Sequence, residues 1–294
     1  MITEDADLLL PTAMVVGVLG RGIVPAGEPV IRADDLGLVR GDGCFETARV
    51  VTGADGGSTV AHLDAHLQRL GRSTAALDIV VDLEQCRRLV LDVCAAWREP
   101  GEAAVKLMVS RGIEGSGRPT VLATVRASSP TSLRQRFAGV RVVTLPRGTA
   151  SDAYASAGWL LGGVKSLSYA LNMAAQREAL RRGADDAIWV SADGVVLEAP
   201  TAAAVWSLDG RLYTTPDGPT GILASTTVDA LFTAATADGV PCAPAYLALS
   251  DLRQVDGLWL ASSVRGIAPV LTVDGDGLPH DQELTDGLNA YAGF

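Results

Sequence analysis

The spacing of apolar residues divides the chain into short strands and a few helices. In the first half, residues 61–77 and residues 82–97 carry apolar side chains at the intervals of three and four that place them on one helix face. Short apolar runs between turn residues indicate strands, and two of these runs flank the glycine-rich tip GIEGSG as a hairpin. The predicted strands of this half are Met14–Leu19, Glu28–Arg32, Ala104–Ser110 and Thr120–Ala127.

A change of composition separates this half from the next. The segment SSPTSLRQRFAG interrupts the pattern, so we predict an interdomain linker near residues 128–138, between an N-terminal domain over 1–132 and a C-terminal domain over 133–294. After it, VRVVTLP predicts a strand and Ser168–Arg182 a helix, followed by β-like segments with the glycine turns SADG, SLDG and DGDG. Many hairpin-like strands and few helices indicate an α+β fold rather than a doubly wound parallel sheet.

Composition and charge narrow the possible functions. The 294 residues suffice for two subdomains, and the apolar fraction of 48% supplies a core. A net charge of −10 without a Lys/Arg-rich run argues against nucleic-acid binding. The apolar run Ala13–Gly20 is too short to span a membrane, and acidic residues precede it where a signal peptide is basic. The four cysteines form no C-x-x-C pair, so we expect reduced thiols in a cytoplasmic protein.

A scarce lysine is the first candidate for chemistry. The chain has only two lysines, Lys106 and Lys165, and the second lies in GGVKSLSYALN. Arginine carries charge equally well, but only lysine loses its proton near neutral pH when desolvated and so becomes a nucleophile. Scarcity alone fits an ordinary surface lysine as well as it fits a reactive amine.

A carboxylate and a glycine-rich turn suggest what such an amine could serve. Glu198 ends the apolar stretch VVLEAPT, where a buried carboxylate needs a cationic partner such as a protonated pyridine nitrogen. The segment GPTGILASTTVDALFTAA then combines a glycine turn, hydroxyl residues and a helix start, an arrangement that holds a phosphate. Thr226, Thr227 and Arg69 could supply donors to it. The alternatives are a solvent-facing glutamate and ordinary helix capping by Ser225 or Thr226.

Two further arrangements are weaker. His62 and His66 are four residues apart on a predicted helix, a spacing that metals use, but no third ligand has a suitable spacing, so we predict no metal site. Ser166 and Ser168 follow Lys165 rather than precede it, which does not match the S-x-x-K pattern of serine–lysine hydrolases.

Six blocks of the sequence resemble, in order, those of the class IV (fold-type IV) pyridoxal-phosphate enzymes. They are VRGDGCFETARV, HLQRL, VKSLSYALN, GADDAIWVSADGVVLEAPT, GILASTTVDALF and SSVRGIAPV, and they extend from about residue 36 to residue 270. This family contains branched-chain aminotransferases, D-amino acid aminotransferases and 4-amino-4-deoxychorismate lyases. The resemblance implies a smaller N-terminal α/β domain, a larger C-terminal domain with a barrel-like sheet, pyridoxal 5′-phosphate between them, and a homodimer.

The resemblance also assigns expected roles. Lys165 would link covalently to the cofactor and act as acid and base, and Glu198 would pair with the pyridine nitrogen. Tyr169 would approach the phenolic oxygen of the ring. The phosphate would be held by Arg69, Thr226, Thr227 and Ser263. The chain departs from the family pattern at Ala202–Ala204, where an asparagine is common, at Val228, where an arginine is usual, and at Arg40, where a tyrosine is frequent.

The branches of the family differ in the residues that contact the substrate. The block GDGCFETARV is most similar to the lyase form, in which Cys44 replaces a bulky apolar residue. Extra arginines suit the two carboxylates of aminodeoxychorismate. We therefore predict a lyase that binds this small carboxylated substrate through Phe45, Arg40, Arg49 and Arg118. The alternatives are an aminotransferase acting on branched-chain L-amino acids or on D-amino acids, and a cofactor-binding protein that has lost catalysis.

Overall fold

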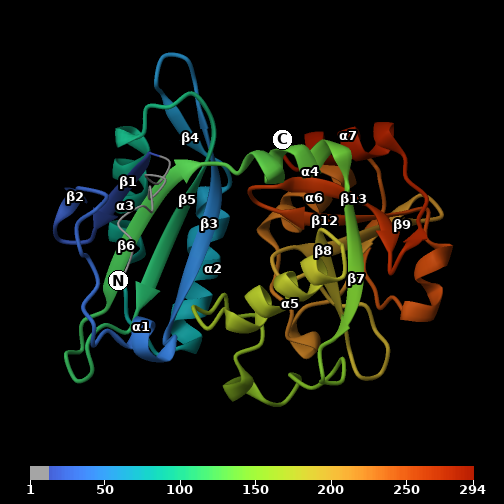
Figure 1. Cartoon of the computed structure of the whole chain (residues 1–294), viewed down its shortest axis with the longest axis horizontal. Helices are drawn as coiled ribbons and strands as arrows, with labels where there is room; N and C mark the ends of the chain where they lie inside the picture. Colours follow the sequence, from blue (N-terminus) through green and yellow to red (C-terminus); the bar gives the residue numbers. More distant parts are fainter. Residues whose placement is uncertain (1–12) are drawn as a thin grey trace, which may run out of the picture.

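The computed structural model describes residues 13–294, which build two β-sheets that lie side by side (Figure 1). The first sheet has the strand order β2-β1-β6-β5-β3-β4 and is antiparallel throughout. Its elements are β1 (Met14–Val18), β2 (Gly22–Val24), α1 (Leu36–Arg40), β3 (Gly43–Thr52), β4 (Ser58–Val60), α2 (Leu63–Ala76), α3 (Leu83–Ala96), β5 (Gly101–Ser110) and β6 (Thr120–Ala127).

The second sheet has the order β11-β10-β9-β12-β13-β7-β8, with the short β14 paired to β13. Strand β7 runs parallel to both of its neighbours, whereas β9, β12 and β13 pair antiparallel. The strands are β7 (Val140–Pro146), β8 (Asp186–Val190), β9 (Ala203–Leu208), β10 (Arg211–Thr214), β11 (Cys242–Pro244), β12 (Gly257–Ser262), β13 (Gly266–Val273) and β14 (Asp276–Gly277). The helices are α4 (Pro130–Ala138), α5 (Ala170–Arg181), α6 (Thr226–Ala237) and α7 (Gln282–Tyr291), with 3₁₀ turns at η1 (Gly158–Leu160), η2 (Gly218–Thr220) and η3 (Leu249–Gln254).

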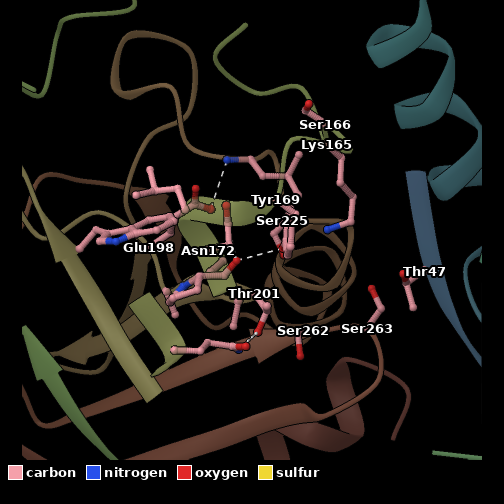
Figure 2. A pocket seen from close by; sticks show the side chains of 18 of the residues that line it. Thr47, Lys165, Ser166, Tyr169, Asn172, Glu198, Thr201, Ser225, Ser262 and Ser263 are labelled. Carbon is pink, nitrogen blue, oxygen red and sulfur yellow. Dashed lines mark hydrogen bonds between the residues drawn. The ribbon is translucent and has the colours of Figure 1, made fainter. Parts of the chain in front are cut away.

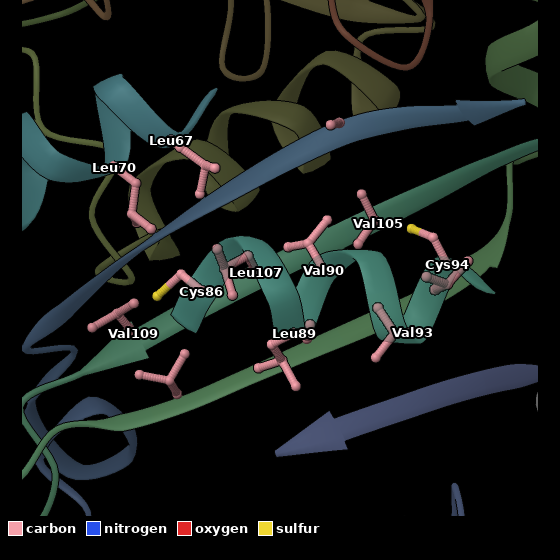
Figure 3. Packing of buried hydrophobic residues seen from close by; sticks show 14 of the residues in the cluster. Leu67, Leu70, Cys86, Leu89, Val90, Val93, Cys94, Val105, Leu107 and Val109 are labelled. Atoms are coloured by element: carbon pink, nitrogen blue, oxygen red, sulfur yellow. The ribbon is translucent and has the colours of Figure 1, made fainter. Parts of the chain in front are cut away.

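Helices α2 and α3 cover one face of the first sheet, and their apolar residues form its core (Figure 3). The Asp82 side chain caps α3 by accepting hydrogen bonds from the backbone N–H groups of Glu84 and Gln85. Leu89 and Val93 of α3 then pack with alternate residues of β5, as the two-residue period of a strand requires. The opposite face of β3 and β5 is not covered by these helices and faces the second sheet.

The second sheet curls, and it is covered on one side by α6 and α7. Val205, Trp259 and Ile267 point to these helices, whereas their strand neighbours Trp206 and Leu260 belong to the core on the other face. Because both faces are buried, the strands read as continuous apolar runs rather than as alternating ones.

The predicted α+β fold with a barrel-like sheet in the second half is confirmed: the structure has two sheets, and the second is a curled half-barrel. The predicted strand Glu28–Arg32 is wrong: the hairpin partner of β1 is β2, and Pro29 could not donate a hydrogen bond to a ladder. The segment predicted as a linker forms helix α4, which joins the last strand of the first sheet to the first strand of the second (Figure 1). The first 12 residues of the predicted N-terminal domain lie outside the described residues. No helix within 13–294 is both long and apolar enough to cross a bilayer.

Candidate active site

A cavity of about 690 Å³ lies between the two sheets. The first sheet contributes Phe45 and Thr47 from β3 and Lys106 from β5 to its wall. The second half contributes the loop before α5, the end of the Glu198 segment, the start of α6 and the turn after β12. Figure 2 shows Lys165, Tyr169 and Glu198 around this opening, with Thr47 on the side of the first sheet.

Lys165 lies on the loop that precedes α5. The backbone N–H of Phe45 donates to the Lys165 carbonyl at 2.9 Å, so β3 fixes the backbone of this loop. The Lys165 Nζ lies 4.8 Å from the centre of the Phe45 ring. Burial, with the nearby positive charge of Arg69, lowers the pKa of Lys165 to about 8. About one tenth of this amine is therefore unprotonated at pH 7.

Glu198 faces the same cavity. Its backbone carbonyl accepts a hydrogen bond from Trp189 N–H, and the backbone N–H of Leu223 donates to Glu198 Oε2 at 3.2 Å. Burial raises the pKa of Glu198 to about 7, against the opposing effects of the Leu223 N–H and the charge of Lys165. In the part of the chain that the structure describes, no cation lies within salt-bridge distance of its carboxylate. A buried carboxylate in this position favours a cationic ligand.

The start of α6 forms a polar cup at one end of the cavity. Ser225 is the N-cap of this helix and accepts from Val228 N–H, so helix capping holds at this position. The Ser263 hydroxyl lies 3.4 Å from Thr226 Oγ1 and 3.3 Å from Thr227 Oγ1. Thr227 and Ser263 line the cavity, whereas Thr226 is buried and does not line it. Free N–H groups at a helix N-terminus and adjacent hydroxyls are suited to an anion.

Arg69 reaches this cup from α2. Its Nη1 donates to the Ala224 carbonyl at 2.7 Å, and its Nε and Nη2 donate to the two oxygens of Glu46, both at 2.7 Å. A guanidinium has five N–H donors. Three are engaged here, and the two that remain are available to a ligand.

Aromatic residues contact the cations of the cavity. The ring centre of Phe45 lies 4.8 Å from the Nζ of Lys165 and 4.3 Å from the Nζ of Lys106. Tyr169 packs edge-on against Phe45, with 5.2 Å between ring centres. The Tyr169 hydroxyl donates to the Pro200 carbonyl at 2.9 Å, and burial raises its pKa to about 12. This tyrosine is therefore a neutral, oriented hydroxyl at neutral pH.

The arginines predicted to bind substrate lie elsewhere in this chain. Arg40 and Arg118 are exposed, and neither lines the cavity formed by the described residues. Arg49 shares a face of β3 with Phe45 but lies beyond the cavity, where its Nη1 donates to the Gly293 carbonyl at 3.0 Å. Their contact with substrate stays a prediction.

The two histidines considered as metal ligands point to different partners. His62 precedes α2 in a left-handed conformation and lies 3.2 Å from the Ala292 carbonyl, so the two residues are not on one helix face. His66 points instead to Glu46. No group of three His, Cys, Asp or Glu residues suited to a metal occurs within residues 13–294.

Sequence reasoning missed several residues of the cavity wall. Lys106 is the second of the two lysines, and its place opposite Thr47 depends on the register of β3 and β5. Arg147 directly follows β7 and stacks at 4.5 Å on the Trp189 ring, and its charge partly opposes the rise that burial causes in the pKa of Glu198. Asn172 donates to the Pro200 carbonyl. The scarcity of lysine was the available signal for Lys106.

The residues that depart from the family pattern lie in different environments. Ala202 and Ala203 line the cavity, so their small side chains enlarge it on the side of β9. Val228 is buried in the core between α6 and the sheet and does not face the cavity.

Comparisons with known proteins agree with this geometry. The family model for amino-transferase class IV matches residues 43–273. A bifunctional aminodeoxychorismate lyase/D-amino acid transaminase of Mycobacterium tuberculosis is 40% identical over 275 residues, which cover 90% of this chain and 93% of the relative.

Two solved structures share the fold. The fold IV transaminase CpuTA1 of Curtobacterium pusillum has a TM-score of 0.88 at 40% identity, covering 95% of this chain and 97% of that one. A hypothetical aminotransferase of M. tuberculosis in its PLP-bound form has a TM-score of 0.90 at 39% identity, covering 95% and 98%. The match extends over both sheets and over the residues that build the cavity, and the chain belongs to the class IV aminotransferase family.

Proposed function

We propose that this protein is a lyase that converts 4-amino-4-deoxychorismate to 4-aminobenzoate and pyruvate. Pyridoxal 5′-phosphate is the cofactor of its family. The observation that carries the cofactor chemistry of this proposal is that a buried amine, Lys165, and a buried carboxyl, Glu198, line one cavity with pKa values shifted toward neutrality. The lyase branch is supported by Lys106, a further cation on the cavity wall.

The residues present suit this cofactor. Glu198 lacks a cationic partner among the described residues, and a pyridine nitrogen that carries a proton would supply one. The two free N–H donors of Arg69, with Thr227, Ser263 and the start of α6, offer a phosphate site. Lys165 would hold the cofactor covalently.

The cofactor supplies an electron sink when a proton leaves the amine-bearing carbon of the substrate. Lys165 accepts and returns that proton, since a pKa of about 8 lets its amine exchange protons near neutral pH. Glu198 stabilises positive charge on its partner because a buried carboxylate is otherwise costly. Tyr169 and Phe45 limit the space beside Lys165 and exclude water from it.

The cations of the cavity support a substrate with carboxylates. Lys106 lines the wall across from the second sheet, and it forms no ion pair with the residues that the structure describes. Burial and Arg126 lower its pKa, so a bound carboxylate would restore its preference for the charged form. We therefore expect Lys106 to bind such a group.

A D-amino acid transaminase is the second candidate. It is favoured by the similarity to the bifunctional M. tuberculosis relative, which is both an aminodeoxychorismate lyase and a D-amino acid transaminase. The same lysine and glutamate serve both reactions, which diverge after the shared proton removal. A third possibility is a cofactor-binding protein that no longer catalyses, because Ala202 and Ala203 depart from the family pattern on the cavity wall.

One experiment distinguishes these candidates. The purified protein is incubated with aminodeoxychorismate without any keto acid, and pyruvate and 4-aminobenzoate are quantified against Lys165→Ala. A lyase releases both products over many turnovers, whereas a transaminase stops after one turnover without an amino acceptor. Consumption of D-alanine that depends on 2-oxoglutarate, without pyruvate release from aminodeoxychorismate, would replace the lyase by the transaminase. Bound cofactor without either reaction would indicate the catalytically inactive protein.

We also propose that the protein forms a homodimer. Exposed apolar side chains lie on α1, in the η1 turn and at the start of α5, and Ser168 Oγ, just before α5, donates to the Gly41 carbonyl after α1. Trp159 is 79% exposed and Leu38 is 64% exposed. Large apolar groups exposed together mark a protein interface, and a second copy of the chain is the proposed occupant.

A further inference from the structure

A buried ionic cluster lies behind the polar cup, on the side of the first sheet. Glu46 follows Phe45 on β3, and because strand side chains alternate, Phe45 and Thr47 face the cavity while Glu46 faces α2. There it meets Arg69 and His66, which are three residues apart on that helix. The side chains of Glu46, His66 and Arg69 are 4%, 3% and 5% exposed.

Glu46 is fully engaged by these two neighbours. Arg69 Nε donates to Oε1 and Arg69 Nη2 to Oε2, both at 2.7 Å, and His66 Nδ1 lies 2.8 Å from Oε2. Burial alone would raise the pKa of Glu46, but the hydrogen bonds from Arg69 and His66 lower it to about 2. The carboxylate can therefore only accept, and His66 donates its Nδ1–H.

This engagement determines how the guanidinium is oriented. The paired contact uses the Nε side of the fork, and such bidentate geometry fixes the plane of the group. The opposite end then meets the Ala224 carbonyl and leaves two N–H donors beside the start of α6. Because Glu46 also balances the positive charge of Arg69, the contribution of Arg69 to an anion comes from directed hydrogen bonds more than from net charge.

We propose that Glu46 and His66 are positioning residues that hold Arg69 for the phosphate group of the cofactor. They lie on the far side of β3 and reach the ligand only through Arg69. This inference rests on the proposed function, in which the cup at α6 holds that phosphate. It assigns a use to a charged cluster that would otherwise weaken an apolar core.

The test compares two ligands that differ by one phosphate. The full-chain protein and its variants are equilibrated by dialysis with pyridoxal 5′-phosphate or with pyridoxal, and the bound fraction is measured by absorbance. Glu46→Gln keeps the size of the side chain but loses its charge and half of its accepting capacity. We expect it to weaken pyridoxal 5′-phosphate binding about 30-fold, the effect of losing a charge-assisted hydrogen bond, and pyridoxal binding less than about twofold.

Three further comparisons separate positioning from folding. His66→Phe should weaken phosphate-ligand binding about fivefold, and His66→Asn, which keeps a donor near the Nδ1 position, should restore it. The double variant Glu46→Gln/Arg69→Ala should bind no more weakly than Arg69→Ala alone, because Glu46 acts through Arg69. At saturating cofactor, kcat of Glu46→Gln should stay within about threefold of the wild type.

The matched control is Glu102→Gln. Glu102 also accepts two hydrogen bonds from one arginine at 2.7 Å, here from Nη1 and Nη2 of Arg136, but it does not line the cavity. Its cofactor affinity should equal that of the wild type. Equal losses of both ligands in Glu46→Gln, an unchanged affinity, or additive effects in the double variant would each overturn the positioning role.

Failure of the proposed function has a different signature. A wild-type protein that takes up no pyridoxal 5′-phosphate overturns both the function and the inference. A wild type that binds it but releases no pyruvate overturns only the lyase, and the affinities of the Glu46 variants still decide the inference.

Discussion

Replacing Glu198 by glutamine should raise the stability of the cofactor-free protein and lower its catalytic activity. Burial raises the pKa of Glu198 from 4.5 to about 7 in the protein without a bound ligand. At 1.36 kcal/mol for each pKa unit, this difference corresponds to about 3 kcal/mol by which the folded state disfavours the carboxylate. Glutamine keeps the shape and cannot ionise. The cofactor-free Glu198→Gln variant should therefore be more stable than the wild type at pH 8, by up to about 3 kcal/mol.

The sign of the pH dependence follows from linkage. Between pH 4.5 and pH 7 the unfolded wild type has already lost the proton that the folded wild type retains. The Glu198 contribution to stability is therefore fully present below pH 4.5, is lost as the pH rises to about 7, and is constant above it. The gain of Glu198→Gln should be absent near pH 4 and complete near pH 8.

The assay is urea unfolding of the cofactor-free full chain at both pH values, followed by tryptophan fluorescence. With cofactor bound the order should reverse, because the glutamine variant cannot pair with a cationic ring, and kcat should fall about 100-fold or more. A cofactor-free variant that is less stable than the wild type at pH 8, or a gain that does not depend on pH, would refute the assigned protonation and burial of Glu198. Near-normal turnover would remove Glu198 from the mechanism.

Three other residues give predictions of different kinds. Lys106→Met should raise KM for aminodeoxychorismate about 10-fold or more, while cofactor affinity, read from absorbance, stays unchanged; an unaltered KM would move the carboxylate site elsewhere. Arg49→Met removes the hydrogen bond to Gly293 and the contact with the Phe294 ring, so the free energy of unfolding should fall by about 1–2 kcal/mol in urea titrations. The KM of this variant should stay within about twofold of the wild type, and a large increase in KM would place Arg49 in the substrate site. Trp159→Glu should shift sedimentation toward the monomer, and a monomeric wild type would contradict the proposed dimer.

More of the residues expected to bind the cofactor than of those expected to bind the substrate could be predicted from the sequence. Lys165 and Glu198 stand out in sequence because each is unusual for its setting, and the structure brings both to one cavity. The hydroxyl residues before α6 were recognisable because a helix start needs caps and an anion uses the same donors. The substrate role of Arg49 stays a prediction: Arg49 shares a face of β3 with Phe45, but it lies farther along the strand and does not line the cavity.

The sequence by itself determined the helices α2 and α3, the hairpin of β5 and β6, the α+β class and the membership in a family, since these follow from local periodicity and from ordered blocks of residues. Only the tertiary structure decided which charges meet. Lys106 enters the cavity because β5 pairs in register with β3, and Glu46 meets His66 and Arg69 because α2 packs on the far face of that strand. Contacts of this kind depend on the register of the strands and on how the helices pack on the sheets. Both are set by burial of the whole core rather than by any local pattern.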